Sequence, residues 1–494
     1  MNTFKRHLHI SASGTNSSGT NLVERSSLEG WRTGQSDNKG QGEDGNRGEP
    51  LSGVTLTPAL SLRERGTIVN IVPVDGAIQS SADSTWLSRL GRTLLFTQFK
   101  LLQHGELTFI DNLGTHRFGK RTEQCSLSAT IHVNHPQLYA DAAFGGSVGA
   151  GEAYIRGLWR CDDLVSLVRL FVINREVLNG MDSRWAWFSQ PFLKLFHFWN
   201  RNSKTGSARN IAAHYDIGNE LYELMLDDTM AYSCGIFATP QATLREASIA
   251  KFDAACRKLD LKPTDHLLEI GTGWGGLAIH AAQHYGCRVT TTTISRKQYE
   301  LTKARVEAAG LSDRITLLLD DYRDLAGAYD KLVSIEMIEA VGAQYLDTYL
   351  AKCASLLKPD GAMLLQAITI QEQLYDQALK SVDFIQRFIF PGSFIPSVNA
   401  ISTSLSRVTD FKVFNLEDIG PHYATTLSHW RQRFFAQLPA VRKLGYSDAF
   451  IRLWEYYLCY CEGGFAERQL GTVQMLLTKP RCRRDVLTVA GRGH

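Results

Sequence analysis

The sequence predicts an α/β protein in which a doubly wound, Rossmann-like parallel sheet follows a small α+β domain. Two patterns carry this prediction. From residue 265 onward, short apolar runs typical of strands alternate with stretches typical of helices, which indicates a parallel sheet covered on both faces. A glycine-rich segment, 271–276, lies between the first of these strands and the helix after it, where a doubly wound fold binds its ligand.

The bulk composition limits the class of protein. The chain has 494 residues, which is enough for two or three domains. A net charge of +3 excludes the strong positive balance that is typical of nucleic-acid-binding proteins. The nine cysteines show no CxxC pair and no metal-ligand spacing, so we expect reduced thiols, a cytoplasmic protein and no metal site. No apolar stretch is long enough to span a bilayer, and no secretory signal opens the chain.

The first part of the chain divides into a tail and a small domain. Residues 1–84 are rich in Ser, Gly, Asn, Thr and Arg, so they cannot bury enough apolar surface to offset their chain entropy, and we expect them to be disordered. The small domain is expected over 85–181. Short apolar groups separated by polar residues and turn signals predict its strands: Leu94–Phe96, Leu101–Leu102, Leu107–Phe109 and Ala129–Val133.

Two helices are expected in the same domain. A glycine-rich turn over 144–151 is expected to open a short helix that reaches Tyr154. Asp162 and Asp163 have the character of helix caps. The helix after them has one apolar face, made of Leu164, Leu167, Val168, Leu170 and Phe171.

A segment rich in aromatic and basic residues, 182–204, links the two domains. Aromatic rings interleaved with bases suit the headgroup boundary of a membrane. A core-packing helix between the domains fits the same residues equally well. The residues concerned are Trp185, Trp187, Phe188, Phe192, Phe196, Phe198 and Trp199, with Arg184, Lys194, His197, Arg201 and Lys204.

The larger domain is expected over 205–480, with a C-terminal tail over 481–494. Its strands are predicted at Asp265–Ile270, Arg288–Ile294, Ile315–Leu319, Tyr329–Ile335 and Gly361–Ile370. Its helices are predicted near 276–285, 296–309 and 344–357.

The segment Glu269–Gly276 has the features of a cofactor loop. Glycines at 271, 273 and 276 let a ligand lie against bare backbone at a helix N-terminus, and their spacing also satisfies the dinucleotide fingerprint. Glu269 lies just before the first glycine, where a carboxylate can orient the amino-acid end of S-adenosylmethionine (SAM). No acidic residue ends the second strand, as a dinucleotide enzyme requires for its ribose. These features favour SAM over a dinucleotide.

Polar residues after the next two strands fit the rest of this cofactor. Thr293, Ile294 and Ser295 run into a helix with Gln298 on its first turn, and their hydroxyls and amide can bond a ribose or adenine without charge. Asp320, Asp321 and Tyr322 follow the third strand, where they can grip the adenine.

An ordered run of motifs resembles the cyclopropane fatty acid synthase and mycolic acid cyclopropane synthase family. The resemblance covers about residues 90–480. The motifs, in chain order, are His214–Asn219, Tyr232–Cys234, the glycine loop with Trp274, Thr293–Gln298, Glu336–Gly342, Phe388–Gly392, His422–Leu427 and Tyr456–Phe465.

The resemblance implies specific site residues. It implies that SAM contacts the loop residues Gly271, Thr272, Gly273, Trp274 and Gly275, together with Tyr232, Ser233, Thr293, Ile294, Ser295 and Gln298. It implies that Cys234, Glu339, Ile368 and Tyr423 line a pocket for a bicarbonate ion that serves as the base. Cys461 matches a cysteine named as an active-site residue of these enzymes. Many members have His where this chain has Gln366, which can donate a hydrogen bond to a carbonate oxygen but cannot carry charge.

Several of these residues also have a purely structural interpretation. Cys234 can be a small buried filler, and Tyr423 can cap a turn. Glu336 can be a contact on the cofactor side or a surface group. The aromatic segment Phe384–Phe394 can line an acyl channel or pack in the core.

The expected reaction is methylene transfer from SAM to a cis double bond of a phospholipid acyl chain, through a carbocation that bound bicarbonate deprotonates. Aromatic faces can stabilise such a cation, and the candidates are Tyr232, Tyr423, Phe384, Phe388 and Phe390. The alternatives are an acyl-chain methyltransferase with a methyl-branched or methylene product, an N-methyltransferase, and a non-catalytic lipid-binding module. We expect the protein to associate peripherally with the inner face of the membrane and to bind no nucleic acid; the sequence leaves a homodimer open.

Overall fold

The computed structural model describes residues 86–176 and 217–485. The predicted tail 1–84, the linker 182–204, the motif residue His214 and most of the predicted C-terminal tail lie outside these residues.

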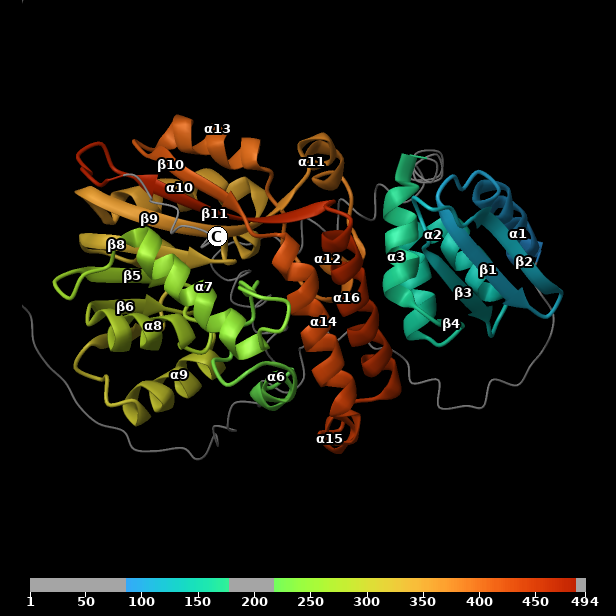
Figure 1. Ribbon diagram of the computed structural model, residues 1–494, viewed down its shortest axis with the longest axis horizontal. Helices are drawn as coiled ribbons and strands as arrows, with labels where there is room; N and C mark the ends of the chain where they lie inside the picture. Colours follow the sequence, from blue (N-terminus) through green and yellow to red (C-terminus); the bar gives the residue numbers. More distant parts are fainter. Residues whose placement is uncertain (1–85, 177–216, 486–494) are drawn as a thin grey trace, which may run out of the picture. The chain divides into compact units, whose positions relative to one another are not determined.

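The first domain is a small sheet with three helices (Figure 1). Its four strands lie in the order β2-β1-β3-β4, with β1 antiparallel to β2 and parallel to β3, and β3 antiparallel to β4. The elements are α1 (Trp86–Phe99), β1 (Gly105–Asp111), β2 (Gly114–Lys120), β3 (Ser128–Val133), α2 (Gln137–Ile155), β4 (Trp159–Cys161) and α3 (Leu164–Ile173).

Some expectations for this domain were wrong and others are confirmed. The predicted strand Leu101–Leu102 lies between α1 and β1 and is not a strand, whereas Leu107–Phe109 lies in β1 and Ala129–Val133 in β3. Leu94–Phe96 lies in α1 and not in a strand, because the buried face of the segment repeats every four residues, at Gly91, Leu95 and Phe99. The glycine-rich turn lies inside the longer helix α2, which it kinks at Gly146 (φ 58°, ψ −145°). Asp163 is the N-cap of α3, as predicted, and its side chain accepts a hydrogen bond from the backbone N–H of Ser166.

The second domain is a seven-stranded sheet with helices on both faces, as expected (Figure 1). Its strands lie in the order β10-β11-β9-β8-β5-β6-β7, and β11 is antiparallel to both of its neighbours. The strands are β5 (His266–Ile270), β6 (Arg288–Thr292), β7 (Ile315–Leu318), β8 (Tyr329–Ile335), β9 (Leu357–Ile370), β10 (Lys412–Asp418) and β11 (Leu470–Thr478). The α-helices are α6 (Asn219–Met225), α7 (Leu244–Leu259), α8 (Gly276–His280), α9 (Arg296–Ala308), α10 (Leu346–Ser355), α11 (Glu372–Ala378), α12 (Phe384–Phe388), α13 (Val398–Val408), α14 (Pro421–Ala436), α15 (Leu438–Lys443) and α16 (Asp448–Ala466).

Strand β9 shows why this sheet is covered on both faces. Met363 and Leu365 pack in one core with α10 and α13, whereas Ala362 and Leu364 pack in the other core with α7 and α8. Alternate residues of a strand point to opposite faces, so a continuous apolar run fills both cores.

The strands β5, β6 and β8 are parallel, so they all end at one edge of the sheet, and the loops at this edge carry polar residues.

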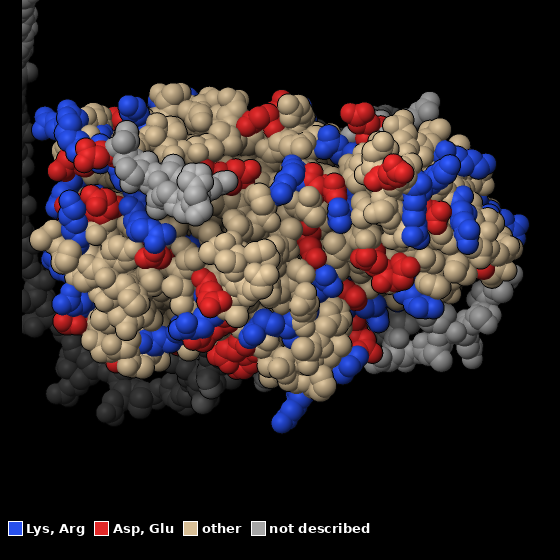
Figure 2. Space-filling view, in the orientation of Figure 1, with Lys and Arg blue, Asp and Glu red and all other residues tan. Residues whose placement is uncertain are grey.

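Charged side chains of both signs are interspersed on the face of the molecule seen in Figure 2. Within the described ranges, no helix is both long enough and apolar enough to cross a membrane.

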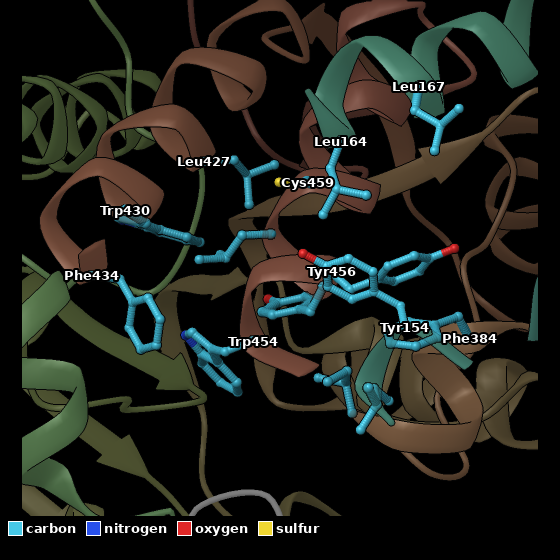
Figure 3. Close-up of a cluster of buried hydrophobic side chains, with 14 of the residues drawn as sticks. Tyr154, Leu164, Leu167, Phe384, Leu427, Trp430, Phe434, Trp454, Tyr456 and Cys459 are labelled. Carbon is cyan, nitrogen blue, oxygen red and sulfur yellow. The ribbon is translucent and has the colours of Figure 1, made fainter. Parts of the chain in front are cut away.

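Helix α16 packs against α2 and α3 of the first domain (Figure 3). The Tyr154 hydroxyl donates to Glu455 (2.8 Å), Arg169 pairs with Glu467 (2.6 Å), and Arg452 donates to the carbonyl of Ile155 (2.8 Å). One hydrophobic core runs from α2 and α3 into α14 and α16. Its members in Figure 3 include Tyr154, Leu164, Leu167, Phe384, Leu427, Trp430, Phe434, Trp454, Tyr456 and Cys459.

Candidate active site

The glycine loop after β5 forms one wall of a cavity of about 680 Å³. Gly271, Gly273 and Gly275 have φ of 101°, 52° and 82°, a conformation that favours glycine. The backbone N–H groups of Gly271 and Thr272 both donate to the carbonyl of Thr292, which fixes the loop to the end of β6. A Cβ atom at Gly273 would meet nothing within 4 Å, so a ligand has room against the bare backbone there.

Glu269 lies at the start of this loop and is buried in the cavity wall. One of its carboxylate oxygens accepts a hydrogen bond from the Thr291 hydroxyl (2.6 Å). Burial raises the pKa of Glu269 to about 8, while the Thr291 hydrogen bond and the charge of Lys251 act in the opposite direction. A cationic amino group next to this carboxylate would offset its desolvation and favour its charged form.

The loops after β6 and β7 supply polar groups on the next side of the cavity. Thr293 donates from its hydroxyl to the side-chain oxygen of Gln298 (2.8 Å), and both residues line the cavity. Asp321 also lines it, but its carboxylate is paired with Arg323 (2.6 Å). Tyr322 packs edge-on against Tyr349, with ring centroids 5.3 Å apart.

Lys251 on α7 is a buried cation in the same cavity. Its Nζ donates to the hydroxyl of Ser233 (2.8 Å) and lies 4.2 Å from the ring centroid of Phe252. Among the described residues, no carboxylate oxygen lies within 4.0 Å of this nitrogen, although the charges of Glu336, Asp227 and Glu269 stabilise it from farther away. Burial lowers the pKa of Lys251 to about 8. An anionic ligand group would supply the close partner that this ammonium lacks.

Glu336 accepts three hydrogen bonds at the carboxyl end of β8. The donors are the backbone N–H of Cys234 (3.0 Å), the side-chain amide of Gln366 (2.8 Å) and the hydroxyl of Tyr423 (2.7 Å). The amide oxygen of Gln366 in turn accepts from Gln474 (2.9 Å), so both ends of this amide are engaged. Glu336 lines the cavity, and burial raises its pKa against the opposing effect of the three hydrogen bonds.

Glu339 is a second buried carboxyl group beside Glu336. One of its oxygens accepts from the backbone N–H of Ile368, and the other has no hydrogen-bond partner among the described residues. Burial, and then the neighbouring charge of Glu336, raise the pKa of Glu339 to about 8. Two carboxylates in one buried site do not both ionise readily, so an ionised Glu336 favours the protonated form of Glu339.

The cavity continues from these polar groups into the first domain. In that domain it is lined mainly by apolar residues of α1, α2, α3 and the small sheet: Leu95, Phe99, Phe109, Ile131, Leu138, Trp159, Leu164, Leu167 and Phe171. Ser147 and Arg175 are polar members of the same lining. Tyr232, Phe390, Tyr423 and Tyr457 contribute aromatic walls to the cavity. The Tyr232 ring stacks on Trp430 (5.0 Å), and its hydroxyl lies 2.7 Å from that of Tyr457.

Comparison with known proteins identifies this arrangement. Residues 202–475 match the family model of mycolic acid cyclopropane synthetase, which is more than half of the chain. The chain belongs to the mycolic acid cyclopropane synthetase family. It is therefore a SAM-dependent methyltransferase, as the resemblance in its motifs implied.

Relatives and solved structures agree with this placement. The cyclopropane-fatty-acyl-phospholipid synthase of Escherichia coli is 36% identical over 357 residues, 72% of this chain and 89% of that protein. The tuberculostearic acid methyltransferase of Mycobacterium tuberculosis is 36% identical over 342 residues, 68% of this chain and 79% of that protein. A mycolic acid cyclopropane synthase complexed with SAH and CTAB is 30% identical, with a TM-score of 0.52, over 55% of this chain and 98% of that one.

The residues of this family member fit SAM. The carboxylate of Glu269 can bind the amino group of SAM, and the ammonium of Lys251 can bind its carboxylate. The open backbone at Gly273 leaves room for this amino-acid end to lie against the loop. The predicted contacts that line the cavity are Tyr232, Ser233, Glu269, Gly271, Thr272, Gly273, Trp274, Thr293, Ile294, Gln298, Asp321 and Tyr322. Gly275 and Ser295 are not among the lining residues; Ser295 caps α9 by accepting from the backbone N–H of Gln298.

The groups predicted to hold bicarbonate fit the ion poorly. The backbone N–H of Cys234, the amide of Gln366 and the hydroxyl of Tyr423 all donate to Glu336, and the N–H of Ile368 donates to Glu339. These donors are therefore already bonded to carboxyl groups of the protein, and we derive no step through bicarbonate.

The remaining predicted residues lie in different environments. Cys461 on α16 lines the cavity, but burial raises the pKa of its thiol, so it is not a ready nucleophile. Ile385, Phe390 and Phe394 of the aromatic segment line the cavity, whereas Phe384 is fully buried and packs on Tyr456 (4.6 Å).

The sequence analysis did not single out Lys251 and left Glu336 between two interpretations. Lys251 follows an unremarkable helical pattern, and only its place on the inner face of α7, beside Ala247 and Ala255, distinguishes it from a surface lysine. Glu336 directly follows an apolar strand, which is a signal for a site residue at the carboxyl edge of a parallel sheet.

Proposed function

We propose that this methyltransferase alkylates the cis double bond of an unsaturated phospholipid acyl chain and closes a cyclopropane ring. The observation that carries the proposal is the single cavity that joins the SAM loop to an apolar pocket in the first domain. An acyl chain is long, narrow and apolar, so it suits a cavity whose lining in the first domain is mainly hydrophobic, with Ser147 and Arg175 as its polar members. The first domain is thus proposed to engage the lipid.

SAM, when bound at the glycine loop, supplies an electrophilic methyl group. Positioning supplies much of the rate in such a reaction, because an alkene is a poor nucleophile and must approach the methyl carbon in line. The aromatic walls around the polar part of the cavity exclude water, which would otherwise capture the carbocation. The faces of Tyr232, Tyr423 and Phe390 can stabilise this cation by up to about 2 kcal/mol in a desolvated site.

A second product is favoured by one specific observation. The tuberculostearic acid methyltransferase is as similar to this chain in identity as the E. coli cyclopropane synthase is. A hydride shift in the same cation, followed by loss of a proton, would leave a methylene group or a methyl-branched alkene in place of a ring, and a reductant would then be needed to give a saturated methyl branch. Both outcomes need the same cavity, and the product alone separates them.

We also propose that the protein meets its substrate at the inner face of the membrane while remaining peripheral. The substrate lies in the bilayer, so the cavity must receive one acyl chain from it. The exposed apolar side chains of the first domain, Trp86 and Leu113 among them, support such a contact.

The test is incubation of the full-length protein with unsaturated phospholipid vesicles and methyl-labelled SAM, followed by acyl-chain analysis. Ring closure is expected to add one CH₂, remove the alkene proton signals and give new ring-proton signals. Vesicles of saturated phospholipid are the control and should take up no label. Label that appears in an acyl chain with methylene or methyl-branch signals would establish the second product, and no transfer to the unsaturated chain would refute the proposal.

A further inference from the structure

We propose that the carboxylate of Glu336 is the base that removes the proton from the transferred carbon, in the place where the resemblance expects a bicarbonate ion. This inference rests on the proposed alkylation of an acyl chain and names the proton acceptor of that reaction.

The hydrogen-bond geometry places an oxyanion of the protein where the ion is expected. Cys234, Gln366 and Tyr423 were each predicted from the sequence to bind bicarbonate, and all three donate to the carboxylate of Glu336 at 2.7–3.0 Å. Glu336 also lines the cavity that contains the SAM loop and the aromatic walls. The same donors thus hold a carboxylate that is covalently attached to the protein.

The surroundings of Glu336 suit a base that gains a proton during turnover. Three hydrogen bonds and the charge of Lys251 favour its ionised form, whereas burial favours the protonated form. Burial prevails and raises the pKa of Glu336, which makes its carboxylate a better proton acceptor than an exposed one. The charge of Glu336 raises the pKa of Glu339, so ionisation of Glu336 disfavours ionisation of its neighbour.

The backbone at Glu336 is held in an uncommon conformation. Its φ is 48°, in the left-handed region that a residue with a Cβ atom adopts only with backbone strain. Its backbone N–H donates to the carbonyl of Gln366 (2.8 Å), which anchors this turn to β9. Glycine would adopt the conformation with less strain, so the presence of glutamate here indicates that the carboxylate is useful at this position.

The proposed step balances as follows. The π electron pair of the alkene forms a bond to the methyl carbon while the carbon–sulfur bond breaks, and its electron pair stays on sulfur. An oxygen of Glu336 then takes a proton from the transferred carbon. The electron pair of that C–H bond closes the ring at the cationic carbon, and Glu336 later releases its proton to solvent. If a hydride shift comes first, loss of the same proton gives a methylene group, so a base is required for either of these products.

The test compares the full-length wild-type enzyme with Glu336 variants in buffer depleted of CO₂ and bicarbonate. The wild type is expected to keep its turnover in this buffer, because its base is part of the chain. Glu336→Gln should lower turnover at least about 100-fold while the Kd for SAM stays within a few-fold of the wild type. Glu336→Gly removes the carboxylate and suits the backbone, and added bicarbonate or formate should restore part of its turnover.

A matched control is Glu455→Gln, which alters a half-buried carboxyl group that also accepts from a tyrosine hydroxyl but does not line the cavity. It should keep bicarbonate-independent turnover. The pH profile gives a second readout, because the acidic limb of the wild-type rate should follow Glu336 and that of rescued Glu336→Gly should follow the added acid. If the role of Glu336 were purely structural, the acidic limb of the pH–rate profile of rescued Glu336→Gly would not follow the pKa of the added acid.

Three results would overturn the proposal: loss of wild-type turnover in depleted buffer with recovery on adding bicarbonate, wild-type turnover in Glu336→Gln, or the same acidic limb in the rescued glycine variant as in the wild type. If Glu336→Gly does not fold, the first two measurements still decide. A wild-type enzyme that alkylates no acyl chain in any buffer would refute the proposed function instead, so the two failures are distinguishable.

Discussion

The Nζ of Lys251 lies 2.8 Å from the hydroxyl oxygen of Ser233, inside the cavity that contains the SAM loop. We expect this ammonium to donate a further hydrogen bond to the carboxylate of the SAM amino-acid end. Lys251→Met should weaken SAH binding about 10–100-fold, the value of one lost charge-assisted hydrogen bond.

An SAH analogue without the carboxylate makes this test specific. The wild type should prefer SAH to the analogue, and Lys251→Met should bind the two about equally in calorimetric titrations. Lys258→Met, on the same helix outside the cavity, is the control and should keep the preference. Equal losses for both ligands in Lys251→Met would indicate a structural role only.

SAM binding is expected to release a proton near neutral pH. Glu269, with a pKa of about 8, is mostly protonated in the free protein at pH 7. A bound ammonium group favours the carboxylate and lowers this pKa, so affinity should rise from pH 6 to 7, and the rise should end near pH 8, where Lys251 loses its charge. Calorimetry at pH 7 in phosphate and in Tris should give different apparent enthalpies, and Glu269→Gln should abolish the difference. Equal enthalpies in the wild type would contradict this assignment.

Removal of the Tyr423 hydroxyl should shift the pH dependence of catalysis. This hydroxyl lowers the pKa of Glu336 by donating to it, so Tyr423→Phe leaves a carboxylate with a higher pKa. A base with a higher pKa is lost at a higher pH, and the acidic limb of the rate profile should move upward. Tyr285→Phe removes a similar tyrosine–carboxylate bond, to Asp253 (2.6 Å), outside the cavity and should leave the profile unchanged.

Two glycines of α2 provide a stability test of the packing between α2 and its neighbours. A Cβ atom at Gly151 would lie 2.5 Å from the ring of Phe384, so Gly151→Ala should destabilise the protein by about 1–3 kcal/mol. A Cβ atom at Gly145 would meet nothing within 4 Å, so Gly145→Ala should be neutral or slightly stabilising. Thermal unfolding measures both, and equal midpoints would contradict the close approach of Phe384.

Cys461 is expected to be dispensable for the chemistry. Its buried thiol has a raised pKa and therefore carries almost no thiolate at pH 7. Cys461→Ala should keep most of the turnover while lowering the unfolding temperature, because it leaves a small void beside the cavity. A loss of turnover at unchanged stability and unchanged SAM affinity would show that Cys461 takes part in catalysis.

The sequence predicted the sheet of the second domain better than the helices of the first. The parallel strands are short runs rich in apolar and β-branched residues between glycine and polar turns, and this signal is local. In α1, Leu94–Leu95–Phe96 has the apolar run of a strand, and the four-residue spacing of Gly91, Leu95 and Phe99 determines the helix. One position of this buried face is a glycine and not an apolar side chain, so the helical pattern is hard to detect in the sequence.

The cofactor loop was predictable because its residues are consecutive, whereas the arrangement around Glu336 was not. Its three donors come from positions 102, 30 and 87 residues away in the chain. Only the folded sheet brings α14, β9 and the segment after α6 to the same carboxylate. The sequence therefore identified these donors as neighbours but not the group to which they donate.

The close packing of α16 on α2 and α3 limits how freely the two domains can be recombined among relatives. A Cβ atom at Gly463 of α16 would lie 2.6 Å from the Val168 side chain of α3, so a foreign first domain must supply a matching groove. A chimera that exchanges only the first domain would have steric conflicts where α2 and α3 contact α16. The exchanged part would therefore have to include α16. Since the same helix also brings Tyr457 and Cys461 to the cavity, the part proposed to receive the lipid and the part proposed to alkylate it are expected to diverge together.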